Sequence, residues 1–318
     1  MATFIGGFYL MNFFLKKLLI VIPTLYIAWT VVFVTLNIIP GDPVNLMLGG
    51  RPASEEVREN VRKNLGLDKP VLERYGSFLV NATKGDLGKS YLTRQPVTKM
   101  IKENMMPTIE LSIGGLIFGV FFGVLFGIFA GTKPNSIRDT ISMIIALCGI
   151  SLPSFWIGMM LIYIFGTTLG WVPIVGDGFV SLILPSISVG LFFAGGMARL
   201  TRSSLVDVLN QDYIRTARSK GISKYNIILK HSLRNAMIPP VTLLGIQFGL
   251  LITGAVITEE VFARPGLGQL LLQAILAKDI PLVQALVVYM TAVYIFLNLV
   301  VDFTYGIIDP RIRLERKN

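Results

Sequence analysis

Charged and metal-binding side chains are scarce in this chain of 318 residues. Only 15% of its residues are charged and 53% are hydrophobic, whereas a soluble domain normally carries about a quarter charged residues. The single cysteine, Cys148, excludes a disulfide within the chain, and the single histidine, His231, leaves no His/Asp/Glu cluster for a metal or hydrolase site. We therefore predict no catalytic residue, no metal ligand and no cofactor bound by this chain.

Acidic residues are also missing from the middle of the apolar runs. Glu110 lies near the start of one run and Asp302 near the end of another. A transporter driven by protons or sodium usually carries carboxylates near the middle of the membrane, so the sequence offers no obvious ion-coupled mechanism. The net charge of +10 does not indicate nucleic-acid binding, because the cations border apolar runs and form no aromatic and basic platform.

Long apolar runs are what the sequence does contain. The mean hydropathy is +0.66, and a helix needs about 20 apolar residues to cross a bilayer. We predict an all-α polytopic membrane protein with six transmembrane helices. The predicted spans cover about residues 13–39, 108–131, 139–165, 181–198, 238–258 and 281–303. Residues 1–10 are apolar and irregular, and we assign them no role.

Basic residues occur in alternate connections between these spans. Lys16 and Lys17, the loops 133–138 and 199–235, and the C-terminal tail share one side, which the positive-inside rule makes the cytoplasm. Both termini then lie inside, and we predict a multi-pass membrane protein. We predict three parts: residues 1–39 with the first span, an extracytoplasmic insert 40–107, and a core 108–318 with five spans and the cytoplasmic loop 199–235.

The insert 40–107 has the composition of a water-soluble segment. Ser54 followed by two acids is typical of a helix start, and Gly66 of its end. Gly88-Lys89-Ser90 resembles part of a phosphate-binding loop, but Thr83 occupies the position where such a loop needs its first glycine. We expect no nucleotide site here.

Glycines recur every four residues in the second span. Four-residue spacing places them on one helical face, and small residues let membrane helices approach closely. We predict that this face packs against a neighbouring helix. Its members are Gly115, Gly119, Gly123, Gly127 and Gly131.

Several polar residues and one proline lie inside or beside the later spans. Pro153 should kink the third span, and the kink either lines a translocation path or serves packing. The polar side chains either line that path or bond between helices. The candidate path residues are Ser151, Pro153, Thr242, Gln247, Thr253 and Glu259, the last in a predicted outer loop that precedes a short helix over 269–277.

One strongly polar segment, residues 212–240, lies between two apolar runs. Apolar residues recur at helical spacing on both sides of Gly221, and Gly221 followed by Ser223 is typical of a helix end and a new N-cap. The segment is therefore predicted to form a helix-turn-helix hairpin. Its cations are Arg215, Arg218, Lys220, Lys224, Lys230 and Arg234, with His231 among them.

Arg215-Thr216-Ala217, three residues and then Gly221 resemble the "EAA" loop of binding-protein-dependent ABC importer permeases. The leading Arg-Thr and the later His231-Ser232-Leu233-Arg234 depart from the general pattern, and both resemble the dipeptide/oligopeptide/nickel branch of that family, in its first-permease or "B" type. The insert and the run Glu259 to Gly268 also resemble that branch, so the resemblance covers nearly the whole chain.

The resemblance implies a type I importer fold and a loop that docks into a cleft on a separate ATPase subunit. Tyr213, Ile214, Ala217 and Ile222 would fill the cleft, and cations would meet acids on its rim. The implied coupling residues are Asp212, Tyr213, Arg215, Thr216, Ala217, Arg218, Lys220, Gly221, Ile222, His231 and Arg234.

The resemblance also implies a location in a bacterial or archaeal cytoplasmic (inner) membrane, and it implies partners. These are a homologous second permease subunit, two cytoplasmic ATP-binding subunits that use ATP and Mg²⁺, an extracytoplasmic substrate-binding protein and the lipid bilayer. The implied cargo is short peptides. A nickel, metal-chelate or glutathione-type permease of the same family remains an alternative, and a channel or secondary transporter is the alternative outside it.

Overall fold

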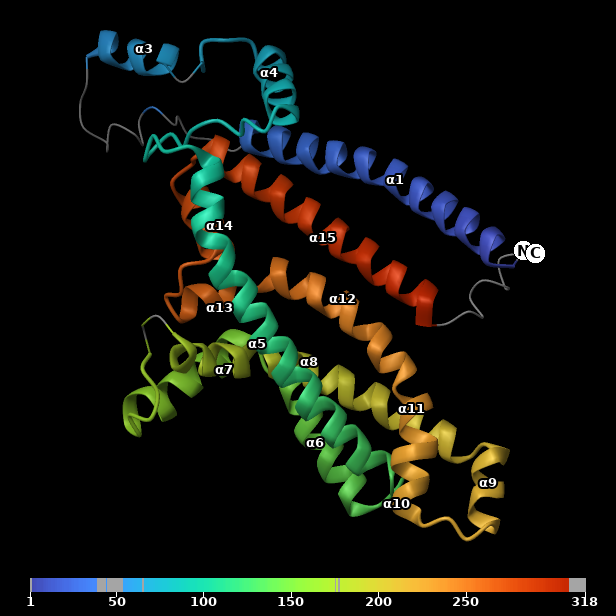
Figure 1. The fold of residues 1–318 in the computed structure, drawn as a ribbon. Coiled ribbons are helices and arrows are strands. Elements are labelled where there is room, and N and C mark those ends of the chain that lie inside the picture. Colours follow the sequence, from blue (N-terminus) through green and yellow to red (C-terminus); the bar gives the residue numbers. More distant parts are fainter. Residues whose placement is uncertain are drawn as a thin grey trace. The chain divides into compact units, whose positions relative to one another are not determined.

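The computed structural model of this chain is built from helices (Figure 1). It describes residues 2–38, 44, 54–64, 66–174, 176 and 178–308, and for residues 2–18, 64, 246, 252–254 and 302–308 it describes the backbone alone. Within these residues, one antiparallel bridge joins Lys89 and Pro96. The chain divides into two compact units. The first is Met1–Pro107 with Pro265–Phe296, and the second is Thr108–Arg264 with Leu297–Asn318.

Four helices of the described residues are long and apolar enough to cross a membrane. They are α1 (Ala2–Ile38), α5 (Val97–Gly131), α8 (Phe179–Leu209) and α15 (Ile280–Ile308). The bent pair α6 (Ile137–Ser151) and α7 (Ser154–Leu161) makes a fifth if it is counted as one span. The predicted all-α membrane architecture is thus confirmed, and the described helices give four or five spans of the predicted six. In the region of the predicted fifth span, α12 (Ile238–Gly254) has only 17 residues.

The predicted kink in the third span is a complete break. Leu152 and Pro153 both adopt extended backbone angles, and the two helical parts that flank them are bent by 102°. A proline disfavours the helical conformation of the residue before it, so Leu152 ends α6 and Pro153 begins a new direction. After α7, residues Ile162–Thr168 continue as a π-helix.

Four helices extend beyond their predicted spans, and α15 does so by a few residues at its C-terminal end, which reaches Ile308. The first begins at Ala2, so residues 2–10 are helical and not irregular. The second, α5, begins at Val97 and continues through Pro107. The fourth, α8, continues through the predicted loop start at residue 199 to Leu209. The extension is stabilised by packing, because Met197, Thr201 and Leu205 recur every four residues on one face of α8 and all three are fully buried.

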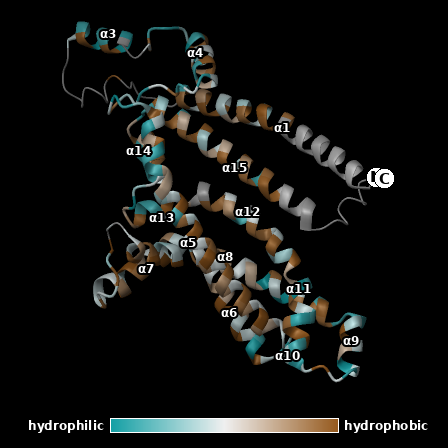
Figure 2. Ribbon diagram, viewed as in Figure 1, coloured by the Kyte–Doolittle hydropathy of each residue, from teal (hydrophilic) through white to brown (hydrophobic). Residues whose placement is uncertain are grey.

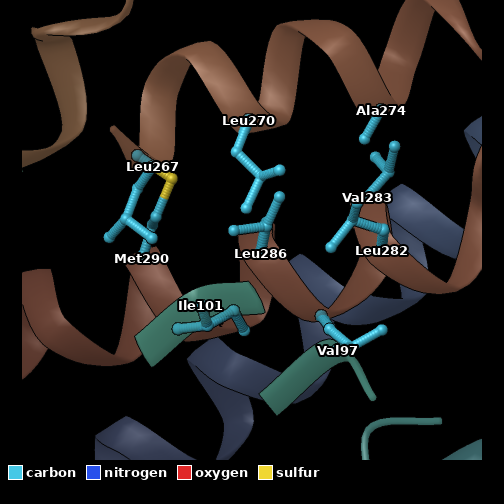
Figure 3. Close-up of a cluster of buried hydrophobic side chains, with 10 residues drawn as sticks. Val97, Ile101, Leu267, Leu270, Ala274, Leu282, Val283, Leu286 and Met290 are labelled. Carbon is cyan, nitrogen blue, oxygen red and sulfur yellow. The ribbon is translucent and has the colours of Figure 1, made fainter. Parts of the chain in front are cut away.

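The first unit has its core where α14 (Leu267–Leu276) packs on α15 and the start of α5. Figure 3 shows Leu267, Leu270 and Ala274 of α14 facing side chains of α15, with Val97 and Ile101 of α5 beside them. The unit also holds α3 (Glu55–Asn64) and α4 (Val71–Thr83) of the insert. Ser54 accepts a hydrogen bond from the Val57 amide, and Gly66 has a φ of +66° after the helix, as the sequence predicts.

The insert is tied to the α14–α15 turn by a buried carboxylate. Asp279 accepts hydrogen bonds from the Ser90 hydroxyl and, at 3.0 Å, from the Tyr91 amide. Ser90 and Asp279 are both 1% exposed. The serine of the Gly-Lys-Ser sequence thus has a structural partner within this unit.

In the second unit, the predicted glycine face of α5 lies against α8. A Cβ atom added at Gly119, Gly123 or Gly127 would lie 2.8–2.9 Å from a backbone carbonyl oxygen of α8. Those oxygens belong to Gly190, Ala194 and Ala198, which share the same four-residue spacing. Gly115 and Gly131 face Val189 and Leu205 of the same helix. The backbones of α5 and α8 are therefore in close contact along this face, with no room for a side chain at these glycines.

A second face of α8 packs equally closely on α6. A Cβ atom at Gly149 of α6 would lie 2.5 Å from the Leu191 carbonyl oxygen, and one at Gly195 of α8 would clash with the Ala146 carbonyl. Toward the end of α8, Arg202 donates two hydrogen bonds of 2.6 Å to the carboxylate of Asp139. Asp139 is 4% exposed and also accepts the Asn135 amide. This bidentate pair fixes the start of α6 to α8.

We predict that Gly127→Ala lowers the stability of the protein by about 1–3 kcal/mol, the typical cost of overpacking. The added methyl group would meet the Ala198 carbonyl at 2.8 Å, and a backbone atom cannot rotate away. Thermal unfolding in detergent measures the effect. The matched control is Gly76→Ala in α4, where no atom lies within 4 Å of the added Cβ. Equal melting temperatures for the two variants would contradict the close α5–α8 contact.

Arg202→Ala should destabilise the protein by about 1.5–3 kcal/mol, because it removes two charge-assisted hydrogen bonds from the buried Asp139 carboxylate, while Arg202 itself is 30% exposed. Arg215→Ala is the control, since Arg215 is 81% exposed and lies 3.8 Å from an exposed Asp212. We expect little change there. The same unfolding experiment compares the two, and similar melting temperatures for both variants would show that the Arg202 pair is not structural.

Candidate functional site

The polar segment folds as the predicted hairpin directly after α8. Its first arm is α9 (Asp212–Ser219), and its second arm runs through α10 (Lys224–Asn226), the π-helix Ile227–Ser232 and α11 (Leu233–Ala236) into α12. Figure 1 shows the two arms side by side at one end of the second unit. Only Asn210 and Gln211 separate α9 from α8. The hairpin is therefore a direct extension of a predicted membrane span.

The turn between the arms is a Schellman motif. Gly221 has a φ of +75°, its amide donates to the Arg218 carbonyl at 3.0 Å, and the Ile222 amide donates to the Ala217 carbonyl at 3.3 Å. Ser223 then caps the second arm by accepting from the Asn226 amide. Both predicted roles, glycine as helix end and serine as N-cap, are confirmed.

The apolar residues of α9 face the inside of the hairpin. Ile214 is 0% exposed, Ala217 is 7% exposed, and both pack on Ile227 with the half-buried Ile222 beside them. Tyr213, Ile214, Ala217 and Ile222 were expected to fill a cleft on a partner. In this structure Ile214 and Ala217 instead hold the two arms together, whereas Ile222 is half-buried and Tyr213 is 44% exposed. The hydroxyl of Tyr213 accepts a hydrogen bond of 2.9 Å from Asn235 and links α9 to α11.

The outer surface of the hairpin is basic. Its exposed cationic side chains are Arg215, Arg218, Lys220, Lys224, Lys230 and Arg234, with His231 exposed beside them. Asp212 and Thr216 are exposed on the first arm, and Figure 2 shows hydrophilic colour along α9. Such a surface attracts an acidic partner and gives its binding a dependence on salt.

Two apolar side chains on the second arm also face outward. Tyr225 is 72% exposed and Leu229 is 41% exposed. They are four residues apart and lie on the face of the helix opposite to the buried Ile227, which is two residues from each. Residues 227–232 form the π-helical part of this arm. Tyr225 and Leu229, which the sequence analysis did not assign to the site, are therefore available to an outside protein, as is Tyr213, which is 44% exposed.

The candidate path residues lie at the α6–α7 break, on α12 and on α13 (Val256–Val261). Ser151 and Pro153 are exposed at the α6–α7 break, and Thr242 donates to the Ile238 carbonyl of its own helix at 2.9 Å. Gln247 is 7% exposed and lies beside Gly196 of α8. The side chain of Thr253 lies outside those that the structure describes.

Glu259 is placed differently from the outer loop expected for it. It lies in the short helix α13 (Val256–Val261), is 0% exposed, and accepts a hydrogen bond of 2.6 Å from the Thr108 hydroxyl. Arg264 pairs with Glu110 at 2.6 Å. The structure therefore joins α5 to the α13 region by two polar contacts. Thr108 and Arg264 were not among the predicted site residues, although Arg264 lies within the run Glu259 to Gly268.

No group of three or more His, Cys, Asp and Glu side chains that could hold a metal ion occurs among the described residues.

Comparison with known proteins places the chain in a transport family. Residues 123–314 match the "Binding-protein-dependent transport system inner membrane component" model, and residues 10–112 match the N-terminal model of binding-protein-dependent transport system membrane components. The chain is 46% identical to the glutathione transport system permease protein GsiC of Escherichia coli O6:H1, over 96% of this chain and 100% of that protein. The GsiC proteins of E. coli K12 and Shigella dysenteriae serotype 1 are each 45% identical over the same shares.

A solved structure shares the fold. An inward-facing structure of the MetNI methionine ABC transporter matches 66% of this chain and 96% of the matched chain, with a TM-score of 0.56 and 18% identity. The fold is thus that of a type I importer permease. The chain belongs to the dipeptide/oligopeptide/nickel-type family of binding-protein-dependent ABC importers, as a multi-pass permease subunit of the inner membrane.

Proposed function

We propose that this permease subunit forms part of the translocation path for short peptides, with glutathione-like peptides among them, and that partner ATPases drive it through the hairpin 212–236. The observation that carries the energy-coupling part is the exposed basic hairpin joined directly to α8. The similarity over the full length of GsiC supports the peptide part, since glutathione is itself a tripeptide.

The proposed assembly has four other members. They are a homologous second permease subunit, two cytoplasmic ATP-binding subunits that use ATP and Mg²⁺, and an extracytoplasmic binding protein that delivers the cargo. ATP hydrolysis then belongs to the partners, and this chain contributes the path and the contact through which force enters.

The contact with an ATPase subunit would use the outer face of the hairpin. Arg215, Arg218 and Lys220 meet acids on the partner, and Tyr225 and Leu229 supply the apolar anchors in place of the buried Ile214 and Ala217. Aromatic and arginine side chains are enriched at the centres of such contacts. This assignment keeps the proposed coupling residues and changes which of them touch the partner.

The inner packing of the hairpin suits it to act as a rigid lever. The buried contacts of Ile214 and Ala217 hold the arms together, so a displacement of the hairpin moves α8. The glycine contacts with α5 and the Arg202–Asp139 pair then carry that displacement to α5 and α6. The ATPase must bind the hairpin differently in its nucleotide states, because a contact of equal strength in both states transmits nothing.

We expect Gly221→Val to reduce transport at least tenfold while leaving the amount of protein in the membrane unchanged. A left-handed backbone costs a non-glycine residue about 1–2 kcal/mol, and Gly221 has a φ of +75°. Uptake of labelled peptide and ATPase activity of the assembled complex measure the loss. Gly221→Asn is the matched control, because asparagine tolerates this conformation. Normal uptake by the valine variant would contradict the role of the turn.

The cargo is tested by expressing the chain with its neighbouring reading frames in cells that lack peptide importers. We expect uptake of labelled glutathione or of a labelled dipeptide that continues in the presence of an uncoupler while cellular ATP is maintained. Uptake of nickel without peptide uptake would overturn the peptide substrate and favour the metal-chelate alternative. Uptake that stops with the uncoupler would overturn ATP-driven coupling.

A further inference from the structure

Helix α4 of the insert packs on the membrane-spanning part of α1. Phe78 lies over Trp29 with ring centroids 4.3 Å apart, and Tyr75 packs on Phe33 at 5.0 Å. The hydroxyl groups of Tyr75 and Thr30 share a hydrogen bond of 2.7 Å. Trp29 and Phe33 are both 6% exposed. The contact is therefore a packed interface within the first unit.

The position of α1 in the bilayer can be set from its charges. Lys16 and Lys17 precede a stretch, residues 18–36, that contains no charged residue, and Asn37 follows it. At about 1.5 Å per residue this stretch is close to the thickness of the hydrocarbon core, about 30 Å. It cannot shift far without burying the lysines or leaving apolar side chains in water. Asn37 is the first polar amide side chain after Lys17 and Asp42 is the first charged residue, so the outer edge of the hydrocarbon lies at Asn37 or just beyond it.

The contacts of α4 lie below that edge. Phe33 and Trp29 precede Asn37 by four and eight residues, which places them about 6 Å and 12 Å inside the hydrocarbon for an upright helix. Amphipathic helices of membrane interfaces bury their apolar faces by about 5–10 Å. Arg74 of α4 reaches Asn37 with a hydrogen bond of 2.7 Å, so its charge lies at the edge while the rings pack deeper.

The residues of α4 are arranged for such a position. Glu73, Ser77 and Asn81 recur every four residues on one exposed face. The neighbouring row is apolar where α1 does not cover it, with Leu72 83% exposed and Val80 53% exposed. In water this row would expose large side chains on a helix that buries none of its residues fully. Large apolar side chains of the α1 span are exposed as well, since Ile27 is 60% and Val31 57% exposed. These side chains lie in the stretch that is placed in the hydrocarbon.

We infer that α4 is an interfacial helix set in the outer leaflet against α1, with the row Leu72–Gly76–Val80 in contact with lipid acyl chains. The insert is thus anchored to the bilayer at its middle, and its polar remainder is held near the membrane surface. This inference rests on the membrane placement of α1 and does not depend on the cargo.

Spin labels at single cysteines test the inference in the complete complex, purified with co-expressed partner subunits and placed in vesicles of phosphatidylethanolamine and phosphatidylglycerol. Cys148→Ser removes the native thiol, and labels are attached to Leu72→Cys, Val80→Cys and two controls. The controls are Ser77→Cys on the polar face of α4 and Val57→Cys on α3. Collision with oxygen, which concentrates in lipid, is compared with collision with a water-soluble nickel complex.

We expect the labels at positions 72 and 80 to collide several-fold more with oxygen than with the nickel complex, and the label at position 57 to show the reverse. Nickel collision at position 72 as frequent as at position 57 would overturn the inference. Protection of position 72 from both reagents would overturn it too, because a protein surface would then cover the row. If the purified complex of a cysteine variant is not obtained, the same variant is labelled in intact spheroplasts with a membrane-impermeant maleimide. In this second measurement, the cysteine at position 72 should react far more slowly than the one at position 57.

Discussion

Close approach of backbones around α8 is the constraint on which the second unit depends. Helices in lipid gain nothing by hiding apolar surface from each other, so their association rests on van der Waals contact and on polar links. Here α8 meets α5 through Gly190, Ala194 and Ala198 on one face, and meets α6 through Gly195 on another. The Arg202–Asp139 pair adds a charge-assisted link where these helices approach the basic hairpin. One helix thereby organises both neighbours and the segment that follows it.

The hairpin shows how a charged segment obtains a defined shape with few buried residues. Its inner contact involves Ile214, Ala217 and Ile227, and the Schellman turn at Gly221 satisfies the carbonyl groups that end α9. All cations are then free to face outward. Internal packing and external charge are therefore separate properties of the same segment. This separation explains why apolar spacing in the sequence does not by itself identify a docking surface.

Much of this architecture could be predicted from the sequence, and the failures have physical causes. The glycine row of α5 and the turn at Gly221 were recognisable because both depend on local backbone geometry. The inward side of the second arm was not, because both of its faces carry apolar residues and only the contact of Ile227 with Ile214 and Ala217 shows which face is buried. The span count and the break at Pro153 also needed the structure, because apolar composition shows neither a bend of 102° nor the short α12. The burial of Glu259 required knowledge of its distant partner, Thr108.

The short connection of two residues between α8 and the hairpin has a geometric consequence. Arg202 and Leu209 are separated by seven residues, which is about two turns of an α-helix. Leu209, the last residue of α8, therefore lies at nearly the same azimuth around the helix axis as Arg202, which binds Asp139 of α6. Insertion of a single residue between them would swing the hairpin by about 100° around the α8 axis. The number of residues between Arg202 and the end of α8 thus sets the direction in which the hairpin leaves the helix.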